Sequence, residues 1–352
     1  MSLLNPLDHI RVIDFTTLLP GPLATLFLAR CGAEVIKIEP PGGDPIRTLL
    51  GDGGETFDLL NRGKRSICVD LKESVYRDKV LELISEADVL VEQFRPGVMA
   101  RLGLDYQTVS QINPRMVYAS ITGYGQSGKN VDLAGHDINY IAETGLFDLL
   151  RNRRGEPFNP PFLLADIVGG AWPTCLNVLL GLVSRNQTGR GSYLDVSMTR
   201  GMQSLAFWAV PGAMQDQPAQ NCHPHLGGSL PRYRLYQCRD GKWLALGALE
   251  EKFWQKFCEL VDLPVHFRGV EADASAVHVA VEQLIGSQDA AYWLHRFGQD
   301  DVCCNLVRSL AESLTELPGV GLPLPISPDF DQIENLGDAE SLGASNARLG
   351  IG

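Results

Sequence analysis

The sequence lacks several features that would assign the chain to a common class of protein. None of its apolar runs reaches about 18–20 residues, the length that spans a bilayer as a helix, so we expect no membrane-spanning segment. The first residues, MSLLNPLDHI, have neither a basic start nor an apolar signal stretch, so we expect a cytoplasmic protein. Basic residues are in deficit: 30 Lys and Arg stand against 42 Asp and Glu, a net charge of -12. This balance argues against nucleic acid or an anionic membrane as the main partner.

Motifs of several catalytic classes are also missing. No Cys-x-x-Cys pair is present, so we expect no structural zinc site and interpret the eight scattered cysteines as reduced core thiols. No Gly-x-Gly-x-x-Gly follows the first predicted strand, which disfavours NAD and FAD, and no Gly-x-Ser-x-Gly nucleophile turn occurs. Cys222 and His223, with His225, could bind a metal, but they stand in a predicted linker without further ligands. A plain loop is the favoured interpretation of that segment.

One segment comes close to a phosphate-binding loop. Residues 123–130 read GYGQSGKN, nearly the pattern G-x-x-x-x-G-K-[ST]. The last position is Asn130, which has no hydroxyl to hold magnesium, and no clear helix follows. Both observations disfavour a nucleotide hydrolase.

Strand and helix patterns alternate over the first 125 residues or so. Such alternation predicts right-handed crossovers and an α/β fold with a Rossmann-like, doubly wound, mainly parallel sheet. Strands are predicted at 11–15, 33–39, 66–71, 88–94, 116–121 and 193–198, and helices at 22–30 and 74–87. A long apolar segment, 166–182, predicts a buried helix that bends near Pro173.

The remaining chain predicts a second, smaller domain. Residues 233–249 favour antiparallel strands around a turn at Arg239–Gly241, and 250–261 and 290–297 favour helices. We therefore predict a large Rossmann-like domain and a small α+β domain. The boundaries are 1–205 with 315–352 for the large domain, 225–305 for the small one, and 206–224 and 306–314 for the linkers.

Four acid or imidazole groups are candidates for chemistry. His136 and Asp137 lie together in GHDINY, Asp166 interrupts the apolar run LLADIVGG, and Glu250 ends GALE. Each has a structural interpretation: a His–Asp turn, a helix N-cap and a first-turn glutamate. For Asp166 the functional alternative is an acid or nucleophile at a helix start, where apolar surroundings raise its basicity. Taken singly, the structural interpretations are favoured.

Taken together, these segments resemble the class III CoA-transferase family along essentially the whole chain, and within it the α-methylacyl-CoA racemase branch. The stretches that carry the resemblance are VIDFTTLLPGPLATLFLARCGAEVIKIEPPGGDPIR, LNRGKRSICVDLK, ADVLVEQFRPGVMARLGL, NPRMVYASITGYGQSG, GHDINY, LLADIVGG, TGRGSYLDVSM, YRLYQCRDGKWLALGALE, DDVCCNLVRSLAESL and LGASNARLG.

The resemblance implies an enzyme that inverts the α-carbon of a 2-methylacyl-CoA by moving a proton between two bases. It implies that His136 and Asp166 are the acid/base pair, that Glu250 orients His136, and that the backbone N–H of Asp137 serves an oxyanion hole. The alternative is a CoA-transferase that moves CoA between carboxylic acids through a thioester on Asp166. No cofactor is implied beyond the coenzyme A part of the substrate.

The resemblance also implies how CoA is held and how the chains assemble. The implied CoA-binding residues are Leu18, Leu19, Pro20, Arg47, Gln93, Arg95 and Arg101. Two departures from the family alter this picture: Pro40 and Pro41 stand where many members have an arginine, and Lys129 stands where proline is usual. The family forms interlocked homodimers, so Glu250 is expected to enter each site from the partner chain.

Overall fold

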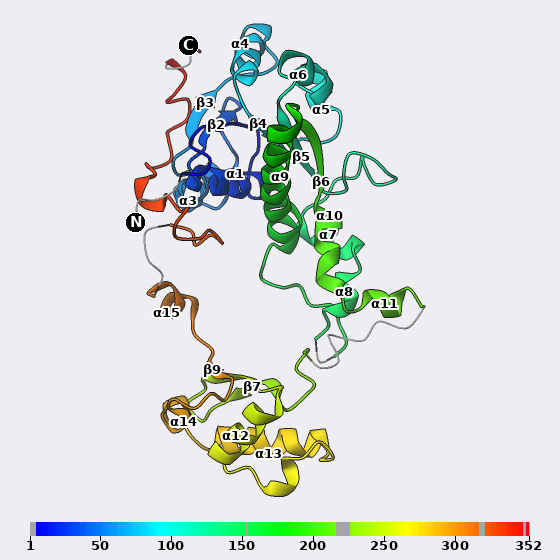
Figure 1. Cartoon of the computed structure of the whole chain (residues 1–352), viewed down its shortest axis with the longest axis vertical. Helices are drawn as coiled ribbons and strands as arrows, with labels where there is room; N and C mark the ends of the chain where they lie inside the picture. The colour runs from blue at the N-terminus through cyan, green and yellow to red at the C-terminus, as the bar shows by residue number, and fades with distance from the viewer. Residues whose placement is uncertain (1–4, 153, 216–225, 317–320, 348–349, 352) are drawn as a thin grey trace. The chain divides into compact units, whose positions relative to one another are not determined.

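The computed structural model describes residues 5–152, 154–215, 226–316, 321–347 and 350–351. The chain divides into two compact units (Figure 1). Unit 1 comprises Met1–Phe147, Asn159–Phe207 and Pro318–Gly352, and unit 2 comprises Asp148–Phe158 and Trp208–Leu317.

Six parallel strands form the sheet of unit 1, in the order β3-β2-β1-β4-β5-β6. In this doubly wound order the direction of winding reverses between β1 and β4. The central strands are apolar because helices cover both faces of the sheet. The strands are β1 Arg11–Asp14, β2 Glu34–Glu39, β3 Arg65–Cys68, β4 Val89–Glu92, β5 Val117–Thr122 and β6 Ser192–Ser197. The predicted α/β fold with a parallel sheet is confirmed.

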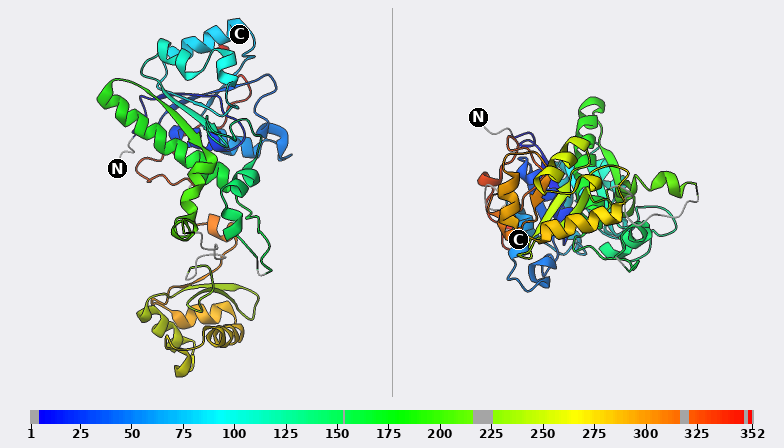
Figure 2. Two further views of the ribbon diagram at one scale, coloured as in Figure 1. Left: turned by 90° about the vertical axis from the view of Figure 1, so that its right-hand side faces the viewer. Right: turned by 90° about the horizontal axis from the view of Figure 1, so that it is seen from below.

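Helices lie on both faces of this sheet (Figure 2, left). On one face Ile13, Leu90 and Tyr118 of the strands pack with Val80 of α4 and Val109 of α6. On the other face α1 and α9 pack against each other and α9 packs on β5 and β6. The elements of unit 1 outside the sheet are α1 Pro20–Arg30, α2 Ile46–Leu49, α3 Glu55–Asn61, α4 Ser74–Ser85, α5 Val98–Leu102, α6 Tyr106–Ile112, α7 Asp137–Glu143, α8 Leu146–Leu149, η1 Ala165–Ala171, α9 Trp172–Thr188, α10 Met198–Met202, η2 Gln203–Ala206 and η4 Ile333–Asn335, of which α8 crosses into unit 2.

The helix predicted to bend near Pro173 changes type there. Ala165–Ala171 is π-helical (η1), and an ordinary α-helix, α9, begins at Trp172 with Pro173 in its first turn. Proline has no N–H to donate, so the hydrogen-bond ladder changes where it enters. Together Ala165–Thr188 is long and apolar enough to cross a membrane by length and composition alone. Its contacts with β5, β6 and α1 are those of a core helix.

Gly169 lets α10 approach η1 closely, because a Cβ at this position would lie 2.2 Å from the carbonyl oxygen of Met198. We expect Gly169→Ala to lower the free energy of unfolding by at least about 1–3 kcal/mol, since a backbone atom must move. Gly286→Ala is the control, because its Cβ would meet nothing nearer than 3.7 Å. Gly286 is the last residue of α13, so the control should raise the free energy of unfolding by at most about 0.5–1 kcal/mol, the helical preference of alanine over glycine. Urea denaturation measures both, and a neutral Gly169→Ala would contradict the prediction.

Unit 2 is built on a three-stranded antiparallel sheet, β7-β8-β9, as predicted for its first two strands. Tyr236, Leu244 and Leu246 point to a core that also holds Trp254 and Trp293. The sequence analysis missed α13 and β9. The elements are α11 Val210–Ala213, β7 Tyr233–Gln237, β8 Trp243–Gly247, α12 Glu251–Leu260, η3 Val265–Phe267, α13 Ala274–Gly286, α14 Ala290–Phe297, β9 Cys304–Leu306 and α15 Leu310–Leu314.

Candidate active site

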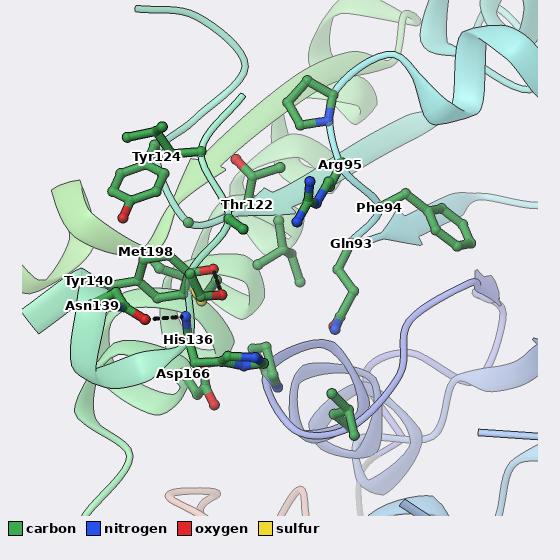
Figure 3. Close-up of a pocket in the computed structure, with 18 of the residues that line it drawn as sticks. Gln93, Phe94, Arg95, Thr122, Tyr124, His136, Asn139, Tyr140, Asp166 and Met198 are labelled. Atoms are coloured by element: carbon green, nitrogen blue, oxygen red, sulfur yellow. Dashed lines mark hydrogen bonds between the residues drawn. The ribbon is translucent and has the colours of Figure 1, made fainter. Parts of the chain in front are cut away.

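A cavity of about 520 Å³ lies at the carboxyl ends of β1, β4 and β5 in unit 1 (Figure 3). This is the point where the strand order reverses, and open α/β sheets bind ligands at such points. The loops that follow these three strands contribute Thr17, Gln93 and Gly123 to the lining. The fourth wall is the beginning of α7 with Asp166 of η1.

His136 and Asp166 both line this cavity, although 30 positions separate them in the sequence. His136 precedes α7, where its backbone N–H donates to Oδ1 of Asn139 at 3.0 Å. Its ring is exposed in unit 1 and lies beside Asp166 in Figure 3. A base and an acid therefore face one space that is open to a ligand.

The Asp166 carboxyl group holds its proton more tightly than an ordinary aspartate. Burial raises the pKa of Asp166 to about 6, the negative charge of Asp137 adds to the rise, and His136 opposes it. A carboxyl group with this pKa can act as acid or base near neutral pH.

Asp137 is buried behind the cavity rather than in its lining. Its Oδ1 accepts the backbone N–H of Ala165 at 2.7 Å and of Asp166 at 3.1 Å. Its own N–H is the first of α7, a position without an acceptor inside the helix. The pKa of Asp137 is raised because burial outweighs the two N–H donors.

Two tyrosines that the sequence analysis missed complete the wall around His136. The rings of Tyr124 and Tyr140 meet edge to face, with centroids 5.3 Å apart, and the Tyr140 hydroxyl donates to the carbonyl oxygen of Gly135. A Cβ on Gly123 would lie 2.1 Å from the Tyr140 ring, and one on Gly135 2.7 Å from it. Gly123 and Gly135 therefore leave the space that the Tyr140 ring occupies. These two glycines, in GYG and GHDINY, are the sequence signal that could have pointed to Tyr140.

The loop between β1 and α1 forms another wall and is held from behind. The Gln93 side chain accepts the N–H of Gly21 at 3.1 Å and donates to the carbonyl of Thr17 at 2.8 Å. Leu18 has φ 62, rare for a residue with a side chain, and its N–H donates to Asp44 Oδ1 at 3.0 Å. Gln93 therefore shapes the loop, and its amide is already engaged on both sides.

Two buried lysines support the same loop. Nζ of Lys37 lies 2.7 Å from the carbonyl oxygen of Thr16 and 3.0 Å from Asp44, and Nζ of Lys64 lies 2.8 Å from the carbonyl oxygen of Pro22. Burial lowers the pKa of Lys64 to about 7, although Asp14 raises it. Lys64 is therefore part of the interior and not of a ligand surface.

The remaining basic residues differ in whether an ion pair already engages their side chains. Arg47 makes a two-bond ion pair with Glu39, at 2.8 Å each, and stacks 3.5 Å above the Phe57 ring, so it lies outside the cavity lining. Arg95 lines the cavity, and no ion pair of its guanidinium is found within the described residues. Arg101 is exposed in α5. Ion pairs also engage Arg62 with Asp338 and Arg65 with Glu34.

Of the other predicted contacts, Leu18 and Pro20 line the cavity, whereas Leu19 packs in the core between α1 and η1. Glu250 belongs to unit 2, where it is exposed and precedes α12. Its carbonyl oxygen accepts the N–H groups of Phe253 and Trp254, each at 3.1 Å. Its carboxylate has no hydrogen bond or ion pair within the part of the chain that the structure describes, so it can face a ligand or another surface.

The alternatives that the sequence disfavoured find no support in the described part of the chain. After the near phosphate loop at 123–130 no helix begins before Asp137. Within the described residues no group of His, Cys, Asp and Glu is arranged to hold a metal ion. The seven described cysteines are free thiols. The segment Cys222–His225 lies outside the described residues.

Comparison with known proteins shows the family of this chain. The model of CoA-transferase family III matches residues 7–318. The chain belongs to CoA-transferase family III. The resemblance inferred from the sequence is thereby confirmed, since the family members compared below include racemases and CoA-transferases.

Two curated members of CoA-transferase family III illustrate this range. "Alpha-methylacyl-CoA racemase" of Mus musculus is 35% identical over 317 residues, which cover 88% of this chain and 79% of the relative. "Acetyl-CoA:oxalate CoA-transferase" of Acetobacter aceti is 36% identical over 314 residues, 82% of this chain and 77% of the relative. A crystal structure of Rv3272 from Mycobacterium tuberculosis matches with a TM-score of 0.84 at 26% identity, covering 99% of this chain and 100% of that one.

Proposed function

We propose that this member of the family is an acyl-CoA racemase or epimerase that inverts the α-carbon of a 2-methylacyl-CoA thioester. The observation that carries the proposal is that His136 and Asp166 line one cavity, with the pKa of Asp166 raised to about 6. Inversion needs one base that removes the α-proton and one acid on the opposite face that returns it.

In this proposal the C–H bond breaks toward one base and its electron pair forms the C=C bond of an enolate. The thioester oxygen then carries the negative charge until the other group protonates the carbon on its opposite face. The Asp137 N–H, at the first position of α7, is our candidate donor to that oxygen. Such a donor contributes about 3–4 kcal/mol. Proton transfer of this kind needs no resident cofactor beyond the CoA part of the substrate.

CoA is assigned to the large domain, residues 1–205 with 315–352. Arg95 is the best placed cation for its phosphates, because it lines the cavity and is unpaired within the described residues. The backbone of Leu18 and Pro20 borders the same cavity, and exposed Arg101 is a second candidate. Arg47 could join only by leaving Glu39, which makes it the weakest of the proposed contacts.

We further propose an interlocked homodimer in which Glu250 of the partner subunit orients the ring of His136. Two observations support a second copy. Glu250 is exposed and precedes a helix of unit 2. The α9 helix of unit 1 presents an exposed apolar stripe of Leu176, Leu180 and Val183, at helical spacing. Mass measurement in solution tests the dimer.

The deciding experiment is proton NMR of one enantiomer of a 2-methylacyl-CoA with the purified enzyme in heavy water. We expect loss of the α-proton signal and formation of both enantiomers. The alternative is a CoA-transferase, the activity in the name of the relative from Acetobacter aceti. Such an enzyme would instead exchange CoA only when an acid acceptor is added. It would also leave an Asp166 adduct that hydroxylamine or borohydride traps. That outcome, without α-exchange, would overturn the racemase proposal.

A further inference from the structure

Asp137 is a buried acid whose side chain is not used by the proposed reaction. It is 8% exposed, and the structure pairs it with no cation among the described residues. Its Oδ1 instead accepts the N–H groups of Ala165 and Asp166, from a segment 28 and 29 positions away. Burying a carboxylate without a cation is unfavourable, so a specific interaction must retain it.

The two accepted N–H groups are the first of the π-helix η1, where no carbonyl of the helix itself is available. A carboxylate at a helix start also interacts favourably with the helix dipole. One buried group thus caps η1 from outside. Because Asp137 follows His136 directly and accepts from the backbone of Asp166, it connects the two segments that carry the proposed acid/base pair.

We propose that the Asp137 carboxylate is a positioning residue that holds Asp166 of η1 in register with His136 of α7. The effect on the rate rests on the proposed function. The hydrogen bonds from Ala165 and Asp166 to Asp137 do not depend on it. Mutagenesis of other enzymes shows how strict such register is: a displacement of about 1 Å can cost about 10²-fold in rate.

The same carboxylate acts on Asp166 through its charge. The groups that face Asp166 are His136, Asp137 and Tyr140 from the α7 segment, with Arg95 across the cavity. The elements packed against η1 add Arg200 on α10, which is exposed, and Asp195 on β6. Among these, Asp137 is the negative charge that raises the pKa of Asp166, after burial.

The test separates position from charge with two variants. Asp137→Asn keeps an oxygen acceptor for both N–H groups but removes the charge, whereas Asp137→Ala removes both. Asp195→Asn is the matched control, because the Asp195 carboxylate also accepts a backbone N–H, that of Gln126 at 3.1 Å, on an exposed loop. The primary readout is the NMR titration of the Asp166 side-chain carbon, which does not depend on activity.

We expect the titration midpoint of Asp166 to fall toward the ordinary aspartate value in Asp137→Asn and to stay unchanged in Asp195→Asn. In the exchange assay, the low-pH limb of the rate profile should move to lower pH in Asp137→Asn. Asp137→Ala should lose about 10²-fold at every pH. If Asp137→Ala does not fold, Asp137→Asn tests the charge, and Asp137→Glu, which keeps the charge but displaces the acceptor oxygen by one methylene, tests the position and should also lower the rate.

Asp137→Ala that keeps the wild-type exchange rate would overturn the positioning role, and an unchanged Asp166 midpoint in Asp137→Asn would overturn the role of the Asp137 charge. Wild-type protein that fails to exchange the α-proton would instead overturn the proposed function, and the Asp166 titration would still report on Asp137. The two failures are therefore distinguishable.

Discussion

Replacing His136 by alanine is expected to slow inversion of a 2-methylacyl-CoA by about 10²–10⁴-fold, the contribution of one general acid/base. The imidazole lines the cavity beside Asp166, and no other histidine lines it within the described residues. Asp166 remains in the variant and can still remove a proton from its own face. Residual deuterium should therefore enter only one enantiomer, and without inversion.

The measurement is proton NMR and chiral separation after reaction in heavy water, started separately from each enantiomer. His9→Ala is the matched control, because His9 is an exposed histidine of the same unit that pairs with Asp8 and does not line the cavity. Inversion at the wild-type rate in His136→Ala would remove this histidine from the mechanism.

Replacing Asp166 by asparagine is expected to have an effect of the same size with the opposite stereochemical preference. His136 alone would exchange the other enantiomer, again without inversion. Under the transferase alternative, the same variant would lose the trapped Asp166 adduct and all acceptor-dependent CoA exchange. The pattern of residual exchange in Asp166→Asn, compared with that in His136→Ala, therefore distinguishes two bases from one nucleophile.

Asp166→Asn should also make the folded protein more stable at neutral pH. The folded-state pKa of Asp166, about 6, lies above the ordinary value, so the folded state loses stability as pH rises and the carboxyl group ionises. The asparagine does not ionise and avoids this loss. The gain in thermal midpoint should be full above about pH 6 and should disappear below the ordinary aspartate pKa, near 4. A gain that is equal at all pH values would contradict this explanation.

The sheet of unit 1 was predictable because its strands are short, apolar and separated by helical periodicity. The strand predicted at 11–15 is one residue longer than β1, and the one predicted at 116–121 is shifted by one residue from β5. The missed α13 has a less obvious apolar period, and β9 has only three residues. Short edge strands are decided by the partner they pair with, here β8, and a partner is not visible in a local pattern.

The candidate site was predictable only as a set of motifs. GHDINY and LLADIVGG supplied His136 and Asp166, but the two tyrosines of the wall were not singled out. Gln93, implied by the resemblance as a CoA contact, lines the cavity, but its amide hydrogen-bonds the backbone of Thr17 and Gly21. Such a choice depends on which polar groups the fold brings within hydrogen-bond distance.

By itself the sequence determined the fold class, the family and the identity of the acid and imidazole groups, because these follow from local patterns and from motifs. Only the tertiary structure decided which charges are free. Arg47 and Lys64 are engaged by Glu39 and by buried groups around Asp14, whereas Arg95 faces the cavity. The physical reason is that strand register and helix packing set every contact between distant residues. They also bury Asp166 and bring Asp137 close to it, and both effects raise its pKa.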